Sequence, residues 1–125
     1  MNVVDSSGWL EYFADGPNAS FFSHPLQRTT DLVVPTITLY EVFKVVLRQC
    51  SESDALQSVA LMQQGSVVDL TSNIAILAAK MSIDHQLPMA DGIILATARM
   101  YRATIWTQDS DFNGIDGVQY IAKNG

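Results

Sequence analysis

The stretch over residues 88–112, PMADGIILATARMYRATIWTQDSDF, constrains the fold of this chain more than any other part. It predicts a helix over residues 91–102, with apolar residues at helical spacing, and then a short β-branched strand over residues 104–107. Asp91 stands at the start of the helix, and Asp109 follows the strand. A helix that leads into a short strand is the repeating piece of a parallel α/β sheet, so both acids belong to the ends of such a unit.

The rest of the 125-residue chain continues the alternation of strands and helices. The expected strands cover residues 2–4, 32–35, 67–70, 104–107 and 118–121. The expected helices cover residues 6–14, 18–27 (weak, and interrupted by Pro25), 38–50, 52–64, 72–86 and 91–102. This order predicts an α/β fold with one domain over residues 1–125. The domain is expected to be a three-layer α/β/α sandwich around a central, mainly parallel sheet of about five strands.

The composition narrows the class of protein further. Hydrophobic residues make up 48% of the chain, which suits a well-packed α/β core. No apolar run reaches the roughly eighteen residues that a membrane-spanning helix needs, so no membrane association is expected. The N-terminus lacks the pattern of a signal peptide, which predicts a cytoplasmic protein. The single cysteine, Cys50, cannot form an internal disulfide and is expected to be buried.

The charge of the chain bears on its partners. The net charge is −6, and the seven Lys and Arg residues are dispersed along the sequence. Binding to long duplex DNA depends on neutralising many phosphates, so that mode of binding is not expected. A small folded RNA that is held locally, or a cationic protein partner, is easier to accommodate.

Several acidic residues at element ends have a local structural explanation. Asp5 could cap the helix that follows it. Glu41 stands three residues after a threonine, which is the spacing of a capping box. Asp91 could interact with the dipole of its own helix. Asp109 and Asp111 could form Asx turns in the loop after the strand.

The predicted topology gives four of these acids a common location. Asp5 and Asp109 follow strands, whereas Glu41 and Asp91 lie in the first turns of helices. In a parallel sheet, the carboxyl ends of the strands and the amino ends of the neighbouring helices share one edge, where ligands bind. Crowded carboxylates repel one another unless a cation offsets their charge. A donor set of oxygens without Cys or His selects Mg²⁺ or Mn²⁺ over zinc.

Four blocks of sequence together resemble the PIN-domain ribonucleases, and most of all the VapC-type toxins of bacterial toxin–antitoxin pairs. The blocks are VDSSGW, LYEVFK, MADGIILATA and TQDSDF, and they contain Asp5, Glu41, Asp91 and Asp109 respectively. The resemblance covers essentially the whole chain. Each block alone is unspecific, but four blocks in this order and at these spacings are fairly specific.

The resemblance implies a set of functional residues. It places the acidic catalytic quartet on Asp5, Glu41, Asp91 and Asp109. Asp5, Asp91 and Asp109 are the implied metal ligands. The implied auxiliary residues are Asp111, Thr107 and Ser6.

The resemblance also implies partners. Members of the family dimerise, and an antitoxin tail crosses the first helices, so we expect a homodimer and a cognate antitoxin. The residues expected to contact the antitoxin are Trp9, Tyr12, Phe21 and Phe22. The candidates for RNA phosphate contacts are Lys44, Arg48 and Arg99. Pro25 within the second helix and the negative net charge fit the family less well, which concerns the RNA-gripping surface more than the chemistry.

The implied function is Mg²⁺-dependent hydrolysis of RNA phosphodiester bonds by the toxin of a toxin–antitoxin pair. The implied substrate is a small structured RNA, such as a tRNA or a segment of rRNA. One alternative is a PIN-domain ribonuclease in housekeeping RNA processing, and another is a PIN-like module that binds RNA or protein without cutting. Phosphotransfer through Asp5 is disfavoured, because Ser7 stands where such enzymes place a second acid.

Overall fold

The computed structural model describes residues 1–123 and has an alternating order of strands and helices. Its strands are β1 (Asn2–Val4), β2 (Val33–Pro35), β3 (Ser66–Val68), β4 (Thr104–Thr107) and β5 (Val118–Tyr120). Its α-helices are α1 (Ser6–Phe13), α2 (Ala19–Leu26), α3 (Thr36–Gln49), α4 (Glu52–Met62), α5 (Ser72–His85) and α6 (Met89–Met100). Two short 3₁₀ helices, η1 (Thr29–Asp31) and η2 (Ser110–Phe112), complete the order.

The strands form two parallel ladders that a single bridge joins. One ladder has the order β1-β4-β5, and the other pairs β2 with β3. A parallel bridge between Asn2 and Leu32 connects them, which gives the spatial order β3-β2-β1-β4-β5. Strands β1, β2 and β3 are therefore neighbours in chain order, and the chain then crosses over so that β4 lies on the other side of β1. The parallel sheet that the sequence predicts is confirmed, and its order reverses between β1 and β4.

Both faces of the sheet are covered by side chains of the core. Val3 and Val4 of β1 are both fully buried, yet they belong to two different hydrophobic clusters. The same is true of Val33 and Val34 in β2. Because successive side chains of a strand point to opposite faces, this pattern requires helices on each side of the sheet.

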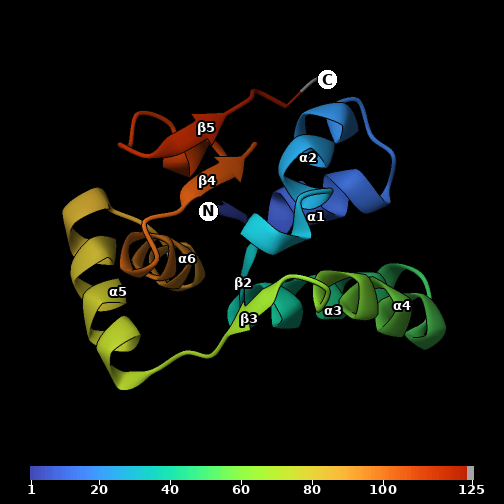
Figure 1. The fold of residues 1–125 in the computed structure, drawn as a ribbon, viewed down its shortest axis with the longest axis horizontal. Coiled ribbons are helices and arrows are strands. Elements are labelled where there is room, and N and C mark those ends of the chain that lie inside the picture. The colour runs from blue at the N-terminus through green and yellow to red at the C-terminus, as the bar shows by residue number, and fades with distance from the viewer. Residues whose placement is uncertain (124–125) are drawn as a thin grey trace.

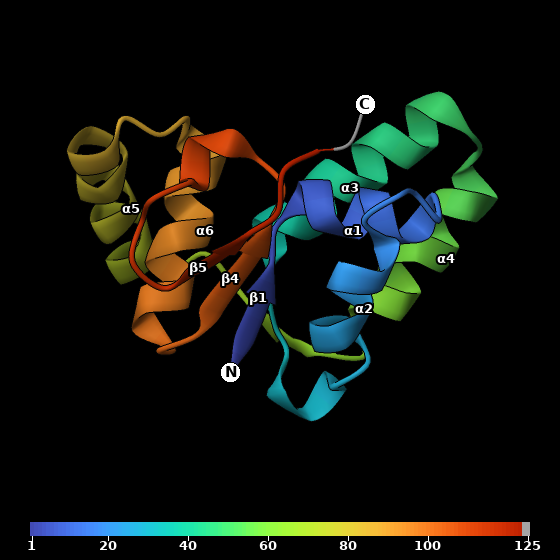
Figure 2. The ribbon, with the colours of Figure 1, turned by 90° about the horizontal axis from the view of Figure 1, so that it is seen from above.

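The helices form the two outer layers (Figures 1 and 2). Helices α5 and α6 lie together on one side of β1 and β4, and α1 and α2 lie together on the other. Helix α3 packs on both α1 and α4 beyond β2. Within residues 1–123, none of the helices combines the length and the apolar character needed to cross a bilayer.

Some boundaries differ from those predicted. Helix α3 begins at Thr36 and α6 begins at Met89, two residues earlier than expected in each case. In each case the residue before the helix is a proline, with a φ of −64° at Pro35 and −56° at Pro88, and the helix begins at the next residue. Pro25 lies in the last turn of α2, so it coincides with the end of that helix rather than a break within it.

Candidate active site

The candidate site lies at the point where the strand order reverses. The parallel pair β1 and β4 places Val4 opposite Trp106, and the backbone N–H of Asp5 donates to the Trp106 carbonyl at 3.2 Å. Asp5 therefore follows β1 at a point beside the carboxyl end of β4. Asp109 lies two residues after the end of β4. Such a reversal is the usual ligand-binding position of open parallel sheets.

Asp5 is held in place by three neighbouring donors. Its carboxylate accepts hydrogen bonds from Thr107 Oγ1 at 2.7 Å, Ser7 Oγ at 2.9 Å and the Gly8 N–H at 3.0 Å. The last bond makes Asp5 the N-cap of α1, as its local explanation predicted. Burial raises the pKa of Asp5 to about 6, although these three hydrogen bonds oppose the rise and the charge of Asp109 adds to it.

The pKa of Asp91 is affected by the charges of all the other acids of the candidate site. Asp91 stands in the first turn of α6 and is half-buried. Burial raises its pKa to about 7, and the charges of four further carboxylates add to that rise. In decreasing order of effect, these carboxylates are Asp109, Asp5, Glu41 and Asp111. The fold therefore gathers the whole predicted quartet, together with Asp111, around one helix terminus.

Glu41 does not form the predicted capping box. Because α3 begins at Thr36, Thr38 lies inside the helix and donates its hydroxyl back to the Pro35 carbonyl at 2.7 Å. The carboxylate of Glu41 instead accepts a hydrogen bond from Ser6 Oγ at 2.6 Å, across from α1. A contact between two helices, and not a local cap, fixes the orientation of Glu41.

Thr107 and the turn after it orient Asp109. The buried Thr107 hydroxyl donates to Asp5 and accepts the Asp109 N–H at 2.9 Å. Asp109 in turn caps η2, because its Oδ1 accepts the Asp111 N–H at 2.9 Å. This Asx-type turn confirms the local explanation of Asp109 and also brings the Asp111 carboxylate back toward the site.

The acids offer a donor set for a hard cation. Asp91, Asp109 and Asp111 each contribute a carboxylate oxygen, and these oxygens lie within 4.8 Å of one another. Three carboxylates without a sulfur or imidazole neighbour in the group fit Mg²⁺ or Mn²⁺. Asp111, which the sequence suggested only as an auxiliary acid, is thus a full member of the cluster. In the sequence, the only indication that Asp111 belongs to the cluster is that it stands two residues after Asp109.

The predicted basic contacts fall in different places. Lys44 is exposed one turn after Glu41, with its ammonium 5.6 Å from the centre of the Tyr40 ring, and Arg48 is exposed one turn further along α3. Arg99 lies in the last turn of α6, about 12 Å along the helix from Asp91, and it donates to the Asp116 carbonyl at 3.0 Å. Arg99 therefore belongs to the opposite edge of the sheet, because it stands at the far end of α6 from Asp91.

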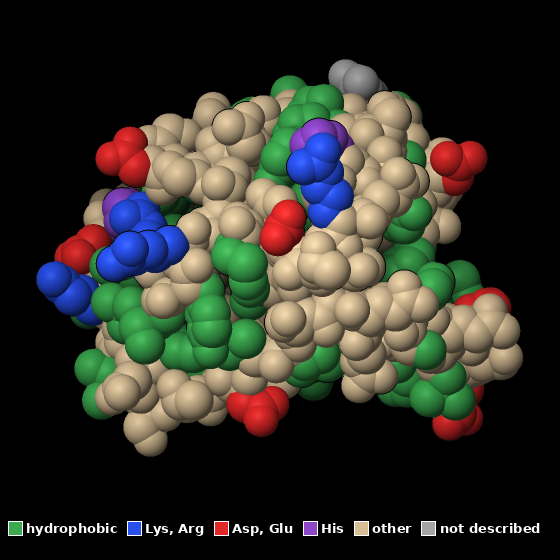
Figure 3. Space-filling view, viewed as in Figure 1, with side chains coloured by type: hydrophobic (Ala, Val, Ile, Leu, Met, Phe, Trp, Pro, Cys, Tyr) green, Lys and Arg blue, Asp and Glu red, His purple; other side chains and the backbone are tan. Residues whose placement is uncertain are grey.

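The basic surface is discontinuous on the face that Figure 3 shows. Lys and Arg side chains appear there in two separate groups, one over α5 and α6 and the other over α2. Hydrophobic and uncharged side chains lie between these groups, together with an acidic side chain next to the group over α2.

The aromatic residues of the first two helices are mostly part of the core. Trp9 is 3% exposed and Phe22 is fully buried, both in the cluster between α1, α2 and the sheet. Tyr12 and Phe21 are half-buried and pack against the same cluster. The prediction that Trp9 and Phe22 contact an antitoxin does not fit this burial. The apolar excess of these helices serves their contacts with each other and with the sheet.

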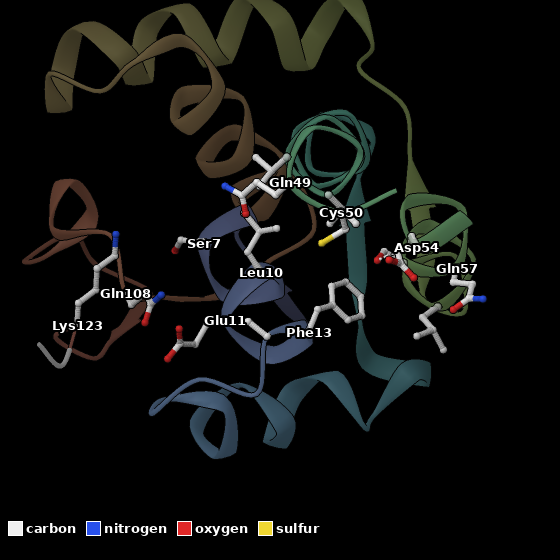
Figure 4. A pocket seen from close by; sticks show the side chains of 15 residues that line it. Ser7, Leu10, Glu11, Phe13, Gln49, Cys50, Asp54, Gln57, Gln108 and Lys123 are labelled. Carbon is white, nitrogen blue, oxygen red and sulfur yellow. Dashed lines mark hydrogen bonds between the residues drawn. The ribbon is translucent and has the colours of Figure 1, made fainter. Parts of the chain in front are cut away.

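A groove runs between α1, α3 and α4 (Figure 4). Its volume is about 670 Å³, and its lining includes Ser7, which donates to Asp5, and Gln108, which directly precedes Asp109. Its apolar wall comes from six side chains: Leu10, Phe13, Ala14, Val45, Val46 and Leu61. Cys50 is exposed in this groove, contrary to the expected burial, because α3 ends one residue before it.

The comparison with protein families decides the classification. The family model described as PIN domain matches residues 3–118. This chain belongs to the PIN-domain family. A sequence comparison with curated proteins finds no match.

Several solved structures share the fold of this PIN domain. A toxin–antitoxin complex from Klebsiella pneumoniae has a TM-score of 0.80 at 23% identity, covering 95% of this chain and 96% of that chain. VapC20 of Mycobacterium tuberculosis, described as a sarcin-ricin loop cleaving toxin, has a TM-score of 0.78 at 17% identity, covering 94% and 97%. DNA-bound VapBC from Salmonella typhimurium has a TM-score of 0.73 at 15% identity, covering 98% of both chains.

Proposed function

We propose that this PIN domain is a divalent-metal-dependent endoribonuclease that acts as the toxin of a toxin–antitoxin pair in the cytoplasm. The observation that carries the proposal is the convergence of Asp5, Glu41, Asp91, Asp109 and Asp111 at the sheet reversal. Burial, together with the charges of neighbouring carboxylates, raises the pKa of Asp5 and of Asp91, which costs stability and calls for a compensating ligand. VapC20, which shares the fold, is described as cleaving the sarcin-ricin loop, so a structured RNA is the proposed substrate class.

The acids divide into those that hold the cation and those that position groups around it. Asp91, Asp109 and Asp111 have the oxygens that lie closest together, and Asp5 stands beside them with its orientation fixed by Thr107 and Ser7. Mg²⁺ or Mn²⁺, when bound, supplies Lewis-acid stabilisation of the charge that develops on a phosphodiester. To Glu41, whose carboxylate accepts a hydrogen bond from Ser6, we assign the role of orienting the attacking water and accepting its proton.

The groove between α1, α3 and α4 supports the proposal of an antitoxin partner. It combines an apolar wall with Ser7, which donates to Asp5, and Gln108, which directly precedes Asp109. A protein segment seated in such a groove would bury the apolar wall and block access to the acids. Antitoxin complexes appear among the solved structures with this fold, and the antitoxin is proposed to use this groove rather than the buried Trp9 and Phe22.

The homodimer is proposed from the outer face of α5. Ile76 and Ile83 are 73% and 81% exposed, and they stand two turns apart on one face of the helix. Met89, 75% exposed, continues this apolar surface at the start of α6. Exposed apolar patches of this kind are typical of surfaces that a second subunit covers.

The decisive experiment compares the purified protein with Asp91→Asn on structured RNA substrates. We expect cleavage by the wild type in Mg²⁺, no cleavage in EDTA, and a loss of at least about 100-fold in Asp91→Asn. Asp31→Asn, in η1 at the opposite edge of the sheet, is the matched control and should retain full activity. Wild-type activity in Asp91→Asn, or undiminished cleavage in EDTA, would remove the proposal. Growth arrest on induction separates a toxin from a housekeeping ribonuclease.

A further inference from the structure

Asn18 lies in a position that normally produces a helix cap, but its side chain is used elsewhere. It precedes α2, and its side chain makes no capping hydrogen bond with that helix. The residue is only 3% exposed. Buried polar groups are nearly always hydrogen-bonded, so the side-chain amide of Asn18 must have partners outside α2.

The side chain of Asn18 reaches the segment that carries Asp109. Its Nδ2 donates to Gln108 Oε1 at 2.9 Å and to the Ala122 carbonyl at 3.1 Å. Gln108 is itself buried, and it stands between Thr107, which binds Asp5, and Asp109. One amide therefore ties the start of α2 to the end of β4 and to the segment after β5.

A second contact fixes Asn18 to α1. Its backbone N–H donates to Glu11 Oε2 at 2.7 Å. Gly16 allows this approach, because a Cβ at that position would lie 2.5 Å from the Glu11 carboxyl carbon. The same helix α1 is capped by Asp5. The end of β4 is thus joined to α1 twice, once through Thr107 and Asp5 and once through Gln108, Asn18 and Glu11.

We infer that Asn18 is a positioning residue of the metal site, acting through Gln108 on Asp109. The inference rests on the proposed function, because it concerns how well the acids hold a cation. The Asn18 amide holds Gln108, and the Thr107 hydroxyl holds the N–H of Asp109, so the segment after β4 is restrained at two successive residues. In this arrangement, a carboxylate oxygen of Asp109 lies within 4.8 Å of those of Asp91 and Asp111. Without the amide, the segment keeps the contacts of Thr107 and the turn at Asp109 but loses the bond that holds Gln108. Outer hydrogen bonds of this kind commonly change metal affinity by about 10–100-fold.

The test measures Mn²⁺ affinity by electron paramagnetic resonance in the absence of RNA. The variant is Asn18→Ala, and the matched control is Asn73→Ala, an exposed asparagine on the outer helix α5. Affinities are compared well below the melting temperature of each variant, with circular dichroism to confirm folding. We expect the Mn²⁺ dissociation constant to rise at least about 10-fold in Asn18→Ala and to stay at the wild-type value in Asn73→Ala.

A second variant keeps the inference open to refutation if Asn18→Ala does not fold. Gln108→Ala removes the same link from its other end, and we expect a rise of similar size. In the double variant, the two effects should not add, because both remove one connection. Full additivity would overturn the route through Gln108.

The outcomes separate this inference from the proposed function. Folded Asn18→Ala with wild-type Mn²⁺ affinity and only a lower melting temperature would show a purely structural role and overturn the inference alone. A wild-type protein that binds no Mn²⁺ would overturn the metal part of the proposed function, and the inference with it.

Discussion

The hydroxyl of Thr107 donates to Asp5 Oδ2 at 2.7 Å and at the same time accepts the N–H of Asp109 at 2.9 Å. A hydroxyl can serve as donor and acceptor together, so one buried side chain orders the acids that follow two neighbouring strands. Thr107 can make both contacts because it ends β4, which pairs with β1. The coupling between the two carboxylates is therefore built into the sheet.

Thr107→Val tests this coupling, because valine keeps the shape of threonine and removes its hydroxyl. Asp5 would lose its shortest hydrogen bond and Asp109 would lose the acceptor for its N–H. We expect the free energy of unfolding to fall by about 1–3 kcal/mol and RNA cleavage to fall about 10–100-fold. Urea denaturation and a cleavage assay measure the two effects. Thr30→Val, exposed in η1, should change neither quantity; a Thr107→Val protein with native activity would refute the coupling.

The stability of the metal-free protein should decrease as the pH rises from about 4 to 7. The pKa values of Asp5 and Asp91 rise from 3.8 to about 6 and about 7, so between these limits the folded state holds more protons than the unfolded state. Raising the pH then favours unfolding. For the buried Asp5, the shift corresponds to about 3 kcal/mol, fully present below pH 4 and lost as the pH passes 6. Urea titrations in EDTA at pH 4 and pH 8 measure this difference.

Asp91→Asn supplies the control for that pH dependence. An asparagine cannot ionise, so in EDTA at pH 8 the variant should be more stable than the wild type and its stability should vary less with pH. Asp31→Asn should follow the wild-type curve. Equal slopes for the wild type and Asp91→Asn would show that Asp91 is not the group responsible.

Adding Mg²⁺ or Mn²⁺ should reverse the loss of stability at pH 8. A cation that binds only the folded state stabilises it by mass action, by about 2.7 kcal/mol at a concentration 100 times the dissociation constant. The melting temperature should therefore rise with either ion in the wild type and stay constant in Asp91→Asn. Na⁺ at matched ionic strength controls for simple screening. A rise of equal size with Na⁺ would contradict a specific site.

The location of the acids could be predicted from the sequence because it depends on order alone. Asp5 and Asp109 follow apolar strands, and Asp91 and Glu41 stand near helix starts, so any parallel sheet brings them to one edge. The role of Glu41 could not be predicted in the same way. Its partner Ser6 is 35 residues away, and a local capping rule competes with that contact until the true start of α3 is known.

Local sequence patterns could also not predict which apolar residues are buried or which polar residues form long-range contacts. An apolar residue such as Trp9 looks the same in sequence whether it packs on a neighbouring helix or on a partner, and the structure assigns it to the core. Asn18 precedes a helix and would be interpreted as its cap, yet its amide binds Gln108 ninety residues later. Residues that join distant segments leave no periodic signal in the sequence.

Gly92→Ala tests how α6 is positioned. Gly92 follows Asp91, and a Cβ there would clash with Ser82 Oγ and lie 2.9 Å from the Ala78 carbonyl oxygen of α5. Because a backbone atom cannot move aside cheaply, we expect a loss of about 1–3 kcal/mol in the free energy of unfolding and weaker metal binding through a displaced Asp91. Ser82→Ala in the same protein should recover part of the stability. Native stability of Gly92→Ala would show that the two helices can separate without cost.

Leu61→Asp tests the groove as the antitoxin site without touching the acids. Leu61 and Leu56 both lie on α4 and are 51% and 53% exposed, but only Leu61 lines the groove. A carboxylate at Leu61 would have to be desolvated under an apolar partner segment. We therefore expect Leu61→Asp to arrest growth even when the antitoxin is expressed from the same operon, whereas Leu56→Asp should still be neutralised. Neutralisation of both variants would place the antitoxin on another surface. Because α4 is remote from the carboxylates, RNA cleavage by either purified variant should match the wild type.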